Sequence, residues 1–292
     1  MISIIVCSKQ GFISEQLHSN IENTIGVPYE LIVIDNSKNQ YSIFEAYNLG
    51  VKQAKYDYLC FMHEDIWYHS GNWGNSVVSR LSKPEIGLIG LAGSYYLLAM
   101  PAHWFEAQPY VVNMIQSFPK NDKPSILFSI KEDQQIICVD GFWFCSRKDV
   151  FKKVSFDCES YTGFHFYDMD ISMQIHLAGY SIWVVCDISV EHISMGSQNR
   201  QWIDSAYIFY RKWKTKLPID INPSLKKKSL VNVRAYKDLL NLHKSNHYPI
   251  SKETLKIGWN TLGLNILTAF LLFYALITLR CFCRLCSYKF PR

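Results

Sequence analysis

The chain has 292 residues, of which 49% are hydrophobic, so it is long enough for one substantial α/β core plus an extension. Its net charge of +5 hides a division: residues 1–199 carry 13 Lys and Arg against 21 Asp and Glu, whereas residues 200–292 carry 17 against 4. The acidic front part argues against nucleic-acid binding, and the basic back part suits either anionic lipid head groups or a solvated basic helix.

The first ninety residues alternate apolar runs with helical periodicity, which predicts the order β-α-β-α-β. Short crossovers of this kind place parallel strands in one sheet with helices on its faces, so the carboxyl ends of the strands should form a ligand crevice. The expected strands cover residues 2–7, 30–34 and 58–62, and the expected helices contain Ile13, Leu17 and Ile21, then Phe44, Tyr47 and Val51. The polar residues at the strand ends are Asp35, Asn36, His63, Glu64 and Asp65.

The α/β pattern continues to about residue 200 and closes near His192, so residues 1–200 are expected to form one catalytic domain. The later expected elements are a strand over 86–91, a broken polar stretch over 121–133, a strand over 136–146, a helix over 167–178 that Gly179 ends, and a strand over 182–185.

Residues 201–256 are expected to form a basic helical extension, followed over 257–292 by an apolar helix and a basic tail. The uncharged run 257–279 has 23 residues, and a helix of that length would measure about 34 Å, enough to cross a hydrocarbon core of roughly 30 Å. Basic residues on both flanks resist translocation equally. The run is therefore an in-plane or re-entrant helix, a true span or a buried soluble helix.

The segment 58–65 is an apolar strand that ends in imidazole and carboxylate groups. A hard divalent cation is held in proteins by one or two carboxylates together with the oxygens of a bound phosphate, whose charge it neutralises. We expect Asp65 to be the first metal ligand. Taken alone, an acidic cluster after a strand also suits a solvated loop or a helix N-terminus.

Several segments, in order and at matching spacing, resemble family 2 glycosyltransferases. His63-Glu64-Asp65 stands where that family carries its Asp-x-Asp motif after a strand of Phe-Leu type. The other matching segments are Ser3–Ser8, similar to the opening strand; Leu31–Ser37, similar to the Asp-Asp-Gly-Ser element; Ala46–Ala54, similar to the Asn-x-Gly helix; and Gly163–Asp170 with Ala178–Tyr180, similar to the Glu-Asp-x-Asp helix and its Gly-Tyr exit. The resemblance covers roughly residues 2–197.

Within that superfamily, His63–Asp65, Gly71–Gly74 and Ile86–Gly93 resemble the branch named after a streptomycin-biosynthesis protein. The resemblance implies an α/β fold of the GT-A (nucleotide-diphospho-sugar transferase) type, with a mostly parallel central sheet flanked by helices. A C-terminal helical extension would follow it.

The departure from the family motif concerns the metal. His63 replaces the first aspartate of the motif, and imidazole suits transition metals such as Mn²⁺ better than Mg²⁺, so the metal preference could shift. Alternatively, His63 hydrogen-bonds a phosphate or is spare, and Glu64 is expected to point away. His192 resembles the late histidine that reaches the metal or diphosphate in some family members, although a lone histidine is more often structural.

The nucleotide-sugar site implied by the resemblance contains Ser8, Asp35, His63 and Asp65. Asp35 would accept hydrogen bonds from the base or ribose, as the matching carboxylate does in the family, unless it is a solvated turn residue. Ser8 is equally suited to a turn.

An inverting transfer needs a carboxylate that deprotonates the acceptor hydroxyl. Asp168 matches the Asp of the family's Glu-Asp pair, with Tyr167 in place of the Glu, and we expect it to be the base. The competing interpretation is that Asp168 and Asp170 both stabilise a helix N-terminus. Asp170 is also a candidate for acceptor binding.

Trp73, His103 and Trp104 are further acceptor candidates because aromatic faces pack on pyranose rings, although core packing is the commoner role of tryptophan. Cys281, Cys283 and Cys286 have metal-like spacing but lack a second Cys/His pair, so free thiols are expected.

The leading hypothesis is an inverting, metal-dependent glycosyltransferase that uses Mn²⁺ or Mg²⁺. It would move a sugar from a nucleoside-diphosphate donor to a polysaccharide or lipid-linked acceptor at the inner face of the cell membrane. Nine irregularly spaced cysteines and no apolar signal after Met1 favour this cytoplasmic side. The alternative is a catalytically inactive nucleotide-sugar-binding, membrane-associated module. A nucleotidyltransferase would need a Gly-rich basic loop, which Ser8–Gly11 does not supply.

Overall fold

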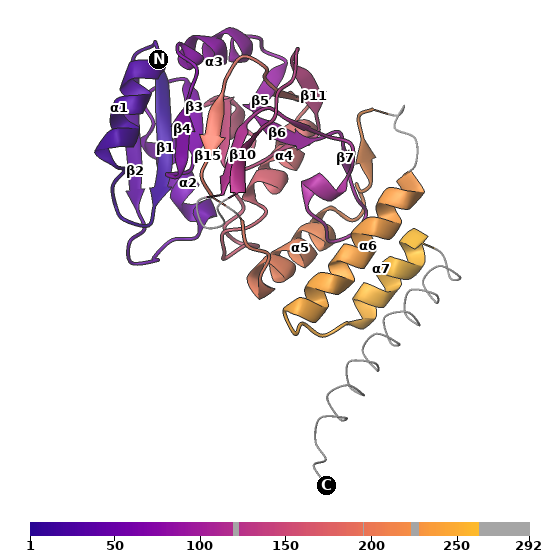
Figure 1. Ribbon diagram of the computed structural model, residues 1–292. Helices are drawn as coiled ribbons and strands as arrows, with labels where there is room; N and C mark the ends of the chain where they lie inside the picture. The colour runs from indigo at the N-terminus through magenta and orange to yellow at the C-terminus, as the bar shows by residue number, and fades with distance from the viewer. Residues whose placement is uncertain (119–122, 195, 223–227, 263–292) are drawn as a thin grey trace. The chain divides into compact units, whose positions relative to one another are not determined.

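The computed structural model describes residues 1–118, 123–194, 196–222 and 228–262. It divides the chain into two units, Met1–Lys226 and Lys227–Arg292 (Figure 1). Strands occupy the middle of the first unit and helices lie around them (Figure 1). The three-part division expected from the sequence, with boundaries near residues 200 and 256, stays a prediction.

The first unit is built on a seven-stranded sheet in which five strands run in one direction and two in the other. The order across the sheet is β11 (Gln134–Ile136), β14 (Ser181–Val184), β5 (Ile86–Gly90), β13 (Trp143–Arg147), β3 (Tyr58–Met62), β1 (Ile2–Ser8) and β2 (Tyr29–Asp35). The mostly parallel central sheet expected from the sequence is confirmed.

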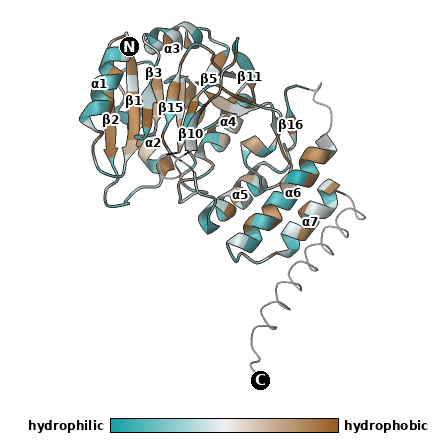
Figure 2. Cartoon of the chain, viewed as in Figure 1, coloured by the Kyte–Doolittle hydropathy of each residue, from teal (hydrophilic) through white to brown (hydrophobic). Residues whose placement is uncertain are grey.

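β1 and β3 lie inside the sheet because they are apolar on both faces: nearly every residue of either strand is buried. The strands are mostly hydrophobic in Figure 2, whereas the helices carry hydrophilic residues on their outer sides. Helix α1 (Glu15–Thr24) begins after Ser14, whose side chain accepts from the backbone N–H of Leu17. Helix α2 (Ile43–Gln53) begins with a capping box of Ser42 and Glu45.

Helix α4 (Tyr167–Leu177) packs on the central sheet together with α2. Aromatic rings fill the space between them: the ring of Tyr47 lies 5.0 Å from that of Phe61 and 5.5 Å from that of Tyr167, and Phe144 lies 4.9 Å from Phe61. Aromatic pairs at these separations add to the free energy of burial. This packing holds the first residue of α4 against the end of the sheet.

The expected single strand over 136–146 is wrong. Ile136 ends β11, β12 (Cys138–Val139) follows, and a break at Asp140-Gly141 separates β12 from β13, which runs in the same direction as β11 and antiparallel between β3 and β5. The hydrophobic run is nearly continuous because β12, β13 and the last residue of β11 are mostly buried, so periodicity alone does not reveal the breaks. The Asp-Gly pair was the available turn signal.

A four-stranded sheet lies beside the carboxyl edge of the central one and brings late residues to early ones. Its order is β10 (Lys123–Leu127), β9 (Ile115–Phe118), β15 (Val190–His192) and β4 (Ile66–Tyr68). The remaining elements of this unit are β6 (Ala92–Ser94) and β8 (Tyr110–Val112), which pair with each other and with β12; β7 (Tyr96–Leu97) paired with β16 (Ile219–Asp220); helices α3 (Trp73–Leu81) and α5 (Arg200–Trp213); and 3₁₀ turns η1 (Trp104–Glu106) and η2 (Val150–Lys152).

In the second unit, the described helices are α6 (Lys228–Ser245) and α7 (Lys252–Leu262), which contact each other. The hydroxyl of Tyr236 donates to the carbonyl of Thr254 at 3.2 Å. The C-terminal helical extension is therefore confirmed. In the part of the chain that is described, no helix has the length and apolarity needed to cross a membrane. Most of the apolar run 257–279, and the three cysteines after it, lie outside the described residues.

Candidate active site

The candidate site begins where β3 ends. His63 follows the last residue of the strand, and its backbone N–H donates to the carbonyl of Phe142 at 2.9 Å, which ties this connection to the start of β13. Two residues later β4 begins and pairs antiparallel with β15, so that His192 lies opposite Ile66. The N–H of Ile193 also donates to the carbonyl of Asp65 at 2.9 Å. This register brings His192 beside Asp65 across 127 positions of sequence.

Three side chains meet there: His63, Asp65 and His192. Asp65 Oδ1 lies 3.7 Å from His63 Nδ1 and 3.7 Å from His192 Nε2. One ligand atom from each residue lies within 4.8 Å of the other two. A separation of 3.7 Å is too long for a hydrogen bond, yet shorter than two metal–ligand bonds of about 2.1 Å laid end to end. The spacing thus fits three ligands of one small cation.

The buried atoms of this group lack other partners. Asp65 Oδ1 and His192 Nε2 are both buried and have no hydrogen-bond partner among the described residues. An unsatisfied buried polar atom costs about 1–3 kcal/mol. Burial also lowers the pKa of His63 to about 4, so its imidazole is neutral at pH 7 and able to bind a cation. The ring of Phe142 stacks on that of His192 at 4.9 Å and holds it in place. These residues fit a divalent cation.

Asp168 lies in the first turn of α4, and its side chain is half-buried. Burial and the nearby carboxylate of Asp140 raise its pKa from 3.8 to about 7. Its Oδ1 accepts from the backbone N–H of Met169 at 2.8 Å, which orients the carboxyl group. A carboxyl group that titrates near neutral pH is suited to proton transfer.

Asp35 ends β2 and is exposed; its Oδ1 accepts from the N–H of Ser37 at 2.9 Å, and that backbone hydrogen bond holds the pKa of Asp35 below its usual range. Gly11, with φ of +81°, passes so close that a Cβ there would lie 2.8 Å from Asp35 Oδ1.

The hydroxyl of Ser8 lies 2.6 Å from the carboxylate of Glu64, so Glu64 points toward the end of β1 and away from the three-residue group. Ser8 itself is fully buried.

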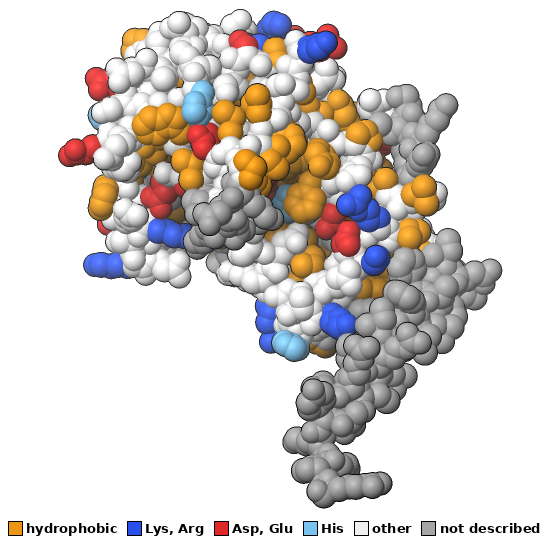
Figure 3. Space-filling view, in the orientation of Figure 1, with side chains coloured by type: hydrophobic (Ala, Val, Ile, Leu, Met, Phe, Trp, Pro, Cys, Tyr) orange, Lys and Arg blue, Asp and Glu red, His pale blue; other side chains and the backbone are white. Residues whose placement is uncertain are grey.

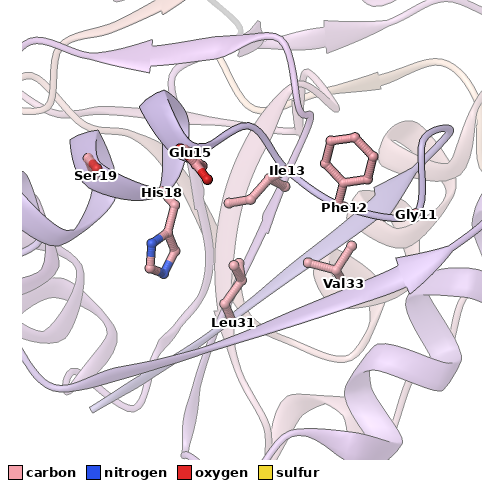
Figure 4. A pocket seen from close by; sticks show the side chains of 8 residues that line it. All are labelled: Gly11, Phe12, Ile13, Glu15, His18, Ser19, Leu31 and Val33. Atoms are coloured by element: carbon pink, nitrogen blue, oxygen red, sulfur yellow. The ribbon is translucent and has the colours of Figure 1, made fainter.

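The loop that carries Gly11 also borders an open cavity of about 500 Å³ between α1 and β2 (Figure 4). Its lining residues are Gly11, Phe12, Ile13, Glu15, His18, Ser19, Leu31 and Val33. None of the His63–Asp65–His192 group lines it, so the cavity is separate from that group.

Two of the acceptor candidates do not fit contact with an acceptor, because they are buried and satisfied. Trp73 is fully buried, stacks on Tyr68 at 4.5 Å and donates from Nε1 to Thr24 Oγ1 at 3.1 Å. Asp170 is also fully buried, and its carboxylate pairs with Lys212 at 2.8 Å. Further donors to it are Trp213 Nε1 and Gln174 Nε2, both at 2.8 Å. Both residues therefore stabilise the fold.

The other two acceptor candidates lie near the acids of the site. Trp104 donates from Nε1 to Asp140 Oδ2 at 2.9 Å, and its ring meets Tyr110 edge-on at 5.8 Å. The ring of His103 lies parallel to that of Trp202 in α5 at 6.2 Å, and burial lowers the pKa of His103 to about 4. Trp104 is itself buried, whereas its neighbours Phe105 and Tyr110 are exposed.

Hydrophobic side chains are exposed around the four-stranded sheet, as the space-filling view shows over the region of β15 and β10 (Figure 3). Those on or beside this sheet are Trp67, Ile126, Leu127 and Ile193. In the pairing of β15 with β4, Trp67 lies opposite Glu191 and Ile66 lies opposite His192, so Trp67 and His192 are on opposite faces of this sheet.

The sequence reasoning missed Asp140 and the role of Tyr167. Asp140 approaches Asp168 from the turn before β13, and Tyr167 contacts His63 through its hydroxyl. The signal for Asp140 was the Asp-Gly pair after an apolar run, the same kind of signal that drew attention to Asp65. Nothing local in the sequence marks Tyr167.

Comparisons with known proteins place these features in context. A model of the family described as "Glycosyltransferase like family" matches residues 3–217. Among solved structures, S. aureus TarS 1-349 is 14% identical, with a TM-score of 0.46, and the alignment covers 90% of this chain and 79% of TarS. GalNAc-T7 with UDP, GalNAc and Mn²⁺ is 9% identical, with a TM-score of 0.46. That alignment covers 89% of this chain and 54% of GalNAc-T7. A197 from STIV is 12% identical, with a TM-score of 0.39 and coverage of 66% and 86%. No curated protein matches.

Proposed function

This chain belongs to the glycosyltransferase-like family, since the family model matches most of its length, and from that premise we propose an inverting, metal-dependent transfer from a nucleoside-diphosphate sugar. The observation that carries the proposal is the His63–Asp65–His192 group at the carboxyl edge of the sheet, with its two unsatisfied buried atoms. The narrower resemblance to the streptomycin-biosynthesis branch is not confirmed by this match.

The three-residue group would hold a divalent cation, Mn²⁺ or Mg²⁺. When bound, the cation neutralises the charge that develops on the leaving diphosphate. Asp65 supplies the carboxylate, and His63 and His192 supply neutral nitrogens. Because β4 and β15 pair directly, Asp65, which immediately precedes β4, is held beside His192 in β15.

Asp168 would act as the base. Its carboxylate takes the proton of the acceptor hydroxyl while the hydroxyl oxygen bonds to the anomeric carbon, and the bond from that carbon to the diphosphate oxygen breaks on the opposite face. A pKa of about 7 suits this task, because about half of the groups are ionised at neutral pH and each remains basic enough to bind a proton. Asp140 supports the role by raising that pKa.

Asp35 would bind the base or ribose of the donor. Its exposed carboxylate stays ionised and is free on the side opposite Ser37, while Gly11 lets the backbone pass within contact distance of it. Ser8 would act only through Glu64, since its hydroxyl is buried and engaged.

The acceptor would be a polysaccharide or a lipid-linked saccharide. The apolar side chains exposed around the four-stranded sheet support an amphiphilic acceptor. Attachment to the inner face of the cell membrane rests on the sequence alone: a back part with 17 basic against 4 acidic residues and the apolar run 257–279.

The experiment uses the full chain with a panel of nucleoside-diphosphate sugars, with Mn²⁺, Mg²⁺ or excess EDTA, and measures the released nucleoside diphosphate. Asp65→Ala should abolish turnover, whereas Asp168→Asn should stop transfer and leave donor affinity near wild type. Asp149→Asn, which removes an exposed carboxylate paired with Arg147, is the control and should keep full activity. Undiminished turnover in EDTA would contradict metal dependence.

The same panel tests the second reading, an inactive nucleotide-sugar-binding module. The feature that favours it is His63 in place of a carboxylate, which leaves one carboxylate in the group. Donor binding without turnover for any donor and metal would support the inactive module.

A further inference from the structure

The hydroxyl of Tyr167 lies between two partners. It donates to the carbonyl of Gly141 at 2.9 Å and lies 2.8 Å from His63 Nε2. A tyrosine hydroxyl has one proton, and a carbonyl oxygen only accepts. With that proton on the Gly141 carbonyl, the hydroxyl oxygen of Tyr167 is the acceptor for His63, so the proton of the imidazole is on Nε2.

The opposite arrangement leaves two groups unsatisfied. If Tyr167 donated to His63, the buried carbonyl of Gly141 would lose this partner, and the imidazole proton would be on Nδ1. Nδ1 faces Asp65 Oδ1 at 3.7 Å, which is beyond hydrogen-bond range. The Nε2–H form is therefore favoured, because it keeps both hydrogen bonds of the Tyr167 hydroxyl.

Close packing fixes the position of the Tyr167 hydroxyl. The residue is buried, and its ring meets those of Phe44 and Tyr47 edge-on, at 6.2 Å and 5.5 Å. Gly141 makes the approach possible, because a Cβ at that position would lie 2.2 Å from the hydroxyl oxygen. The hydroxyl has little freedom to move to other partners.

We propose that Tyr167 is a positioning residue that holds His63 in its Nε2–H tautomer. The lone pair of His63 Nδ1 then faces Asp65 and His192, and the centre prefers a transition-metal ion to Mg²⁺. This inference rests on the metal centre of the proposed function. In the Nε2–H form, His63 Nδ1 directs its electron pair toward Asp65 Oδ1, and with His192 Nε2 as the third ligand atom the three suit one shared cation.

The preference for a transition metal follows from the ligand set. Two imidazole nitrogens and one carboxylate oxygen suit Mn²⁺, Co²⁺ or Zn²⁺, whereas Mg²⁺ prefers an all-oxygen environment. A partner that orients a ligating histidine through its other nitrogen contributes 10–100-fold, roughly, to metal affinity. Tyr167 is such a partner for His63.

The first test measures Mn²⁺ binding to the metal-free full chain by electron paramagnetic resonance of the free ion, with no donor sugar present. Tyr167→Phe should weaken Mn²⁺ binding by about 10–100-fold. Tyr161→Phe is the matched control, since it removes another buried hydroxyl, one that faces Asp170, and it should bind Mn²⁺ as wild type does. In a His63→Ala background, Tyr167→Phe should cause no further loss.

Competition by Mg²⁺ tests the selectivity. We expect Mg²⁺ to displace Mn²⁺ from the wild type only in large excess. In His63→Asp, which restores a second carboxylate, Mg²⁺ should compete at least about tenfold better.

The tautomer can be read in the wild-type site. In the metal-free chain labelled with ¹⁵N-histidine, long-range proton–nitrogen correlations should show His63 with its proton on Nε2; His63→Gln identifies the signal. A proton on Nδ1, or wild-type Mn²⁺ affinity in a folded Tyr167→Phe, would overturn the role of Tyr167 while leaving the metal centre intact. Absence of Mn²⁺ binding in the wild type would instead contradict the metal centre itself.

Discussion

Asp168 gives a prediction in which activity and stability move in opposite directions. Its pKa is raised from 3.8 to about 7 by burial and by Asp140, so the ionised form is disfavoured in the folded chain. Between these two pH values the folded state holds a proton that the unfolded state has lost. The free energy of unfolding therefore falls as the pH rises through this window and levels off above pH 7. Asp168→Asn removes this loss.

The size of the effect follows from the pKa shift. One pKa unit corresponds to about 1.4 kcal/mol, so a shift from 3.8 to about 7 gives an upper bound near 4 kcal/mol, of which roughly 2.5 kcal/mol develops between pH 5 and pH 8. Because water reaches part of the Asp168 side chain, we expect about 1–2.5 kcal/mol in practice. The asparagine oxygen can still accept from the N–H of Met169, so no hydrogen bond of the α4 N-terminus is lost.

Urea unfolding of wild type and Asp168→Asn at pH 5 and pH 8 measures this effect. Relative to wild type, the variant should gain about 1–2.5 kcal/mol more at pH 8 than at pH 5 while it loses sugar transfer. A stability difference that is the same at both pH values would refute the raised pKa, and with it the argument that Asp168 is poised to act as a base.

Three further predictions concern the donor side, the core and the tail. Gly11→Ala should weaken nucleotide binding at least tenfold without unfolding the chain, because the new Cβ would lie 2.8 Å from Asp35 Oδ1. Calorimetry measures the affinity, and an unchanged value would remove Asp35 from the donor site. Asp170→Asn should lower the free energy of unfolding by about 3 kcal/mol, since it breaks a buried ion pair with Lys212; a loss below 1 kcal/mol in urea unfolding would contradict that. The chain that lacks residues 263–292 should still hydrolyse the donor but bind less to vesicles containing anionic lipid, measured in a sedimentation assay. Equal vesicle binding would contradict a lipid contact in this tail.

Much of the fold follows from local pattern. β1, β3 and α2 lie where apolar runs and helical spacing predicted them, because strands buried on both faces and an amphipathic helix with a capping box declare themselves within a few residues. β13 does not: its sequence is as apolar as its neighbours, and its antiparallel place between β3 and β5 depends on pairing with strands distant in the chain.

The candidate site divides in the same way. The sequence alone pointed to the polar residues at or just after strand ends, Asp35, His63 and Asp65, because strand ends and the polar residues near them are local signals. It also supplied the resemblance on which His192 and Asp168 were chosen, and the family match agrees with that resemblance.

Only the tertiary structure decided which of these groups meet and in what state. The pairing of β15 with β4 brings His192 to Asp65, the turn before β13 brings Asp140 to Asp168, and the packing of α4 brings the Tyr167 hydroxyl to His63. Tertiary contacts also removed two acceptor candidates by burying them. The physical reason is that burial, pKa and tautomer depend on which atoms surround a group, and those atoms come from segments that no local window of sequence contains.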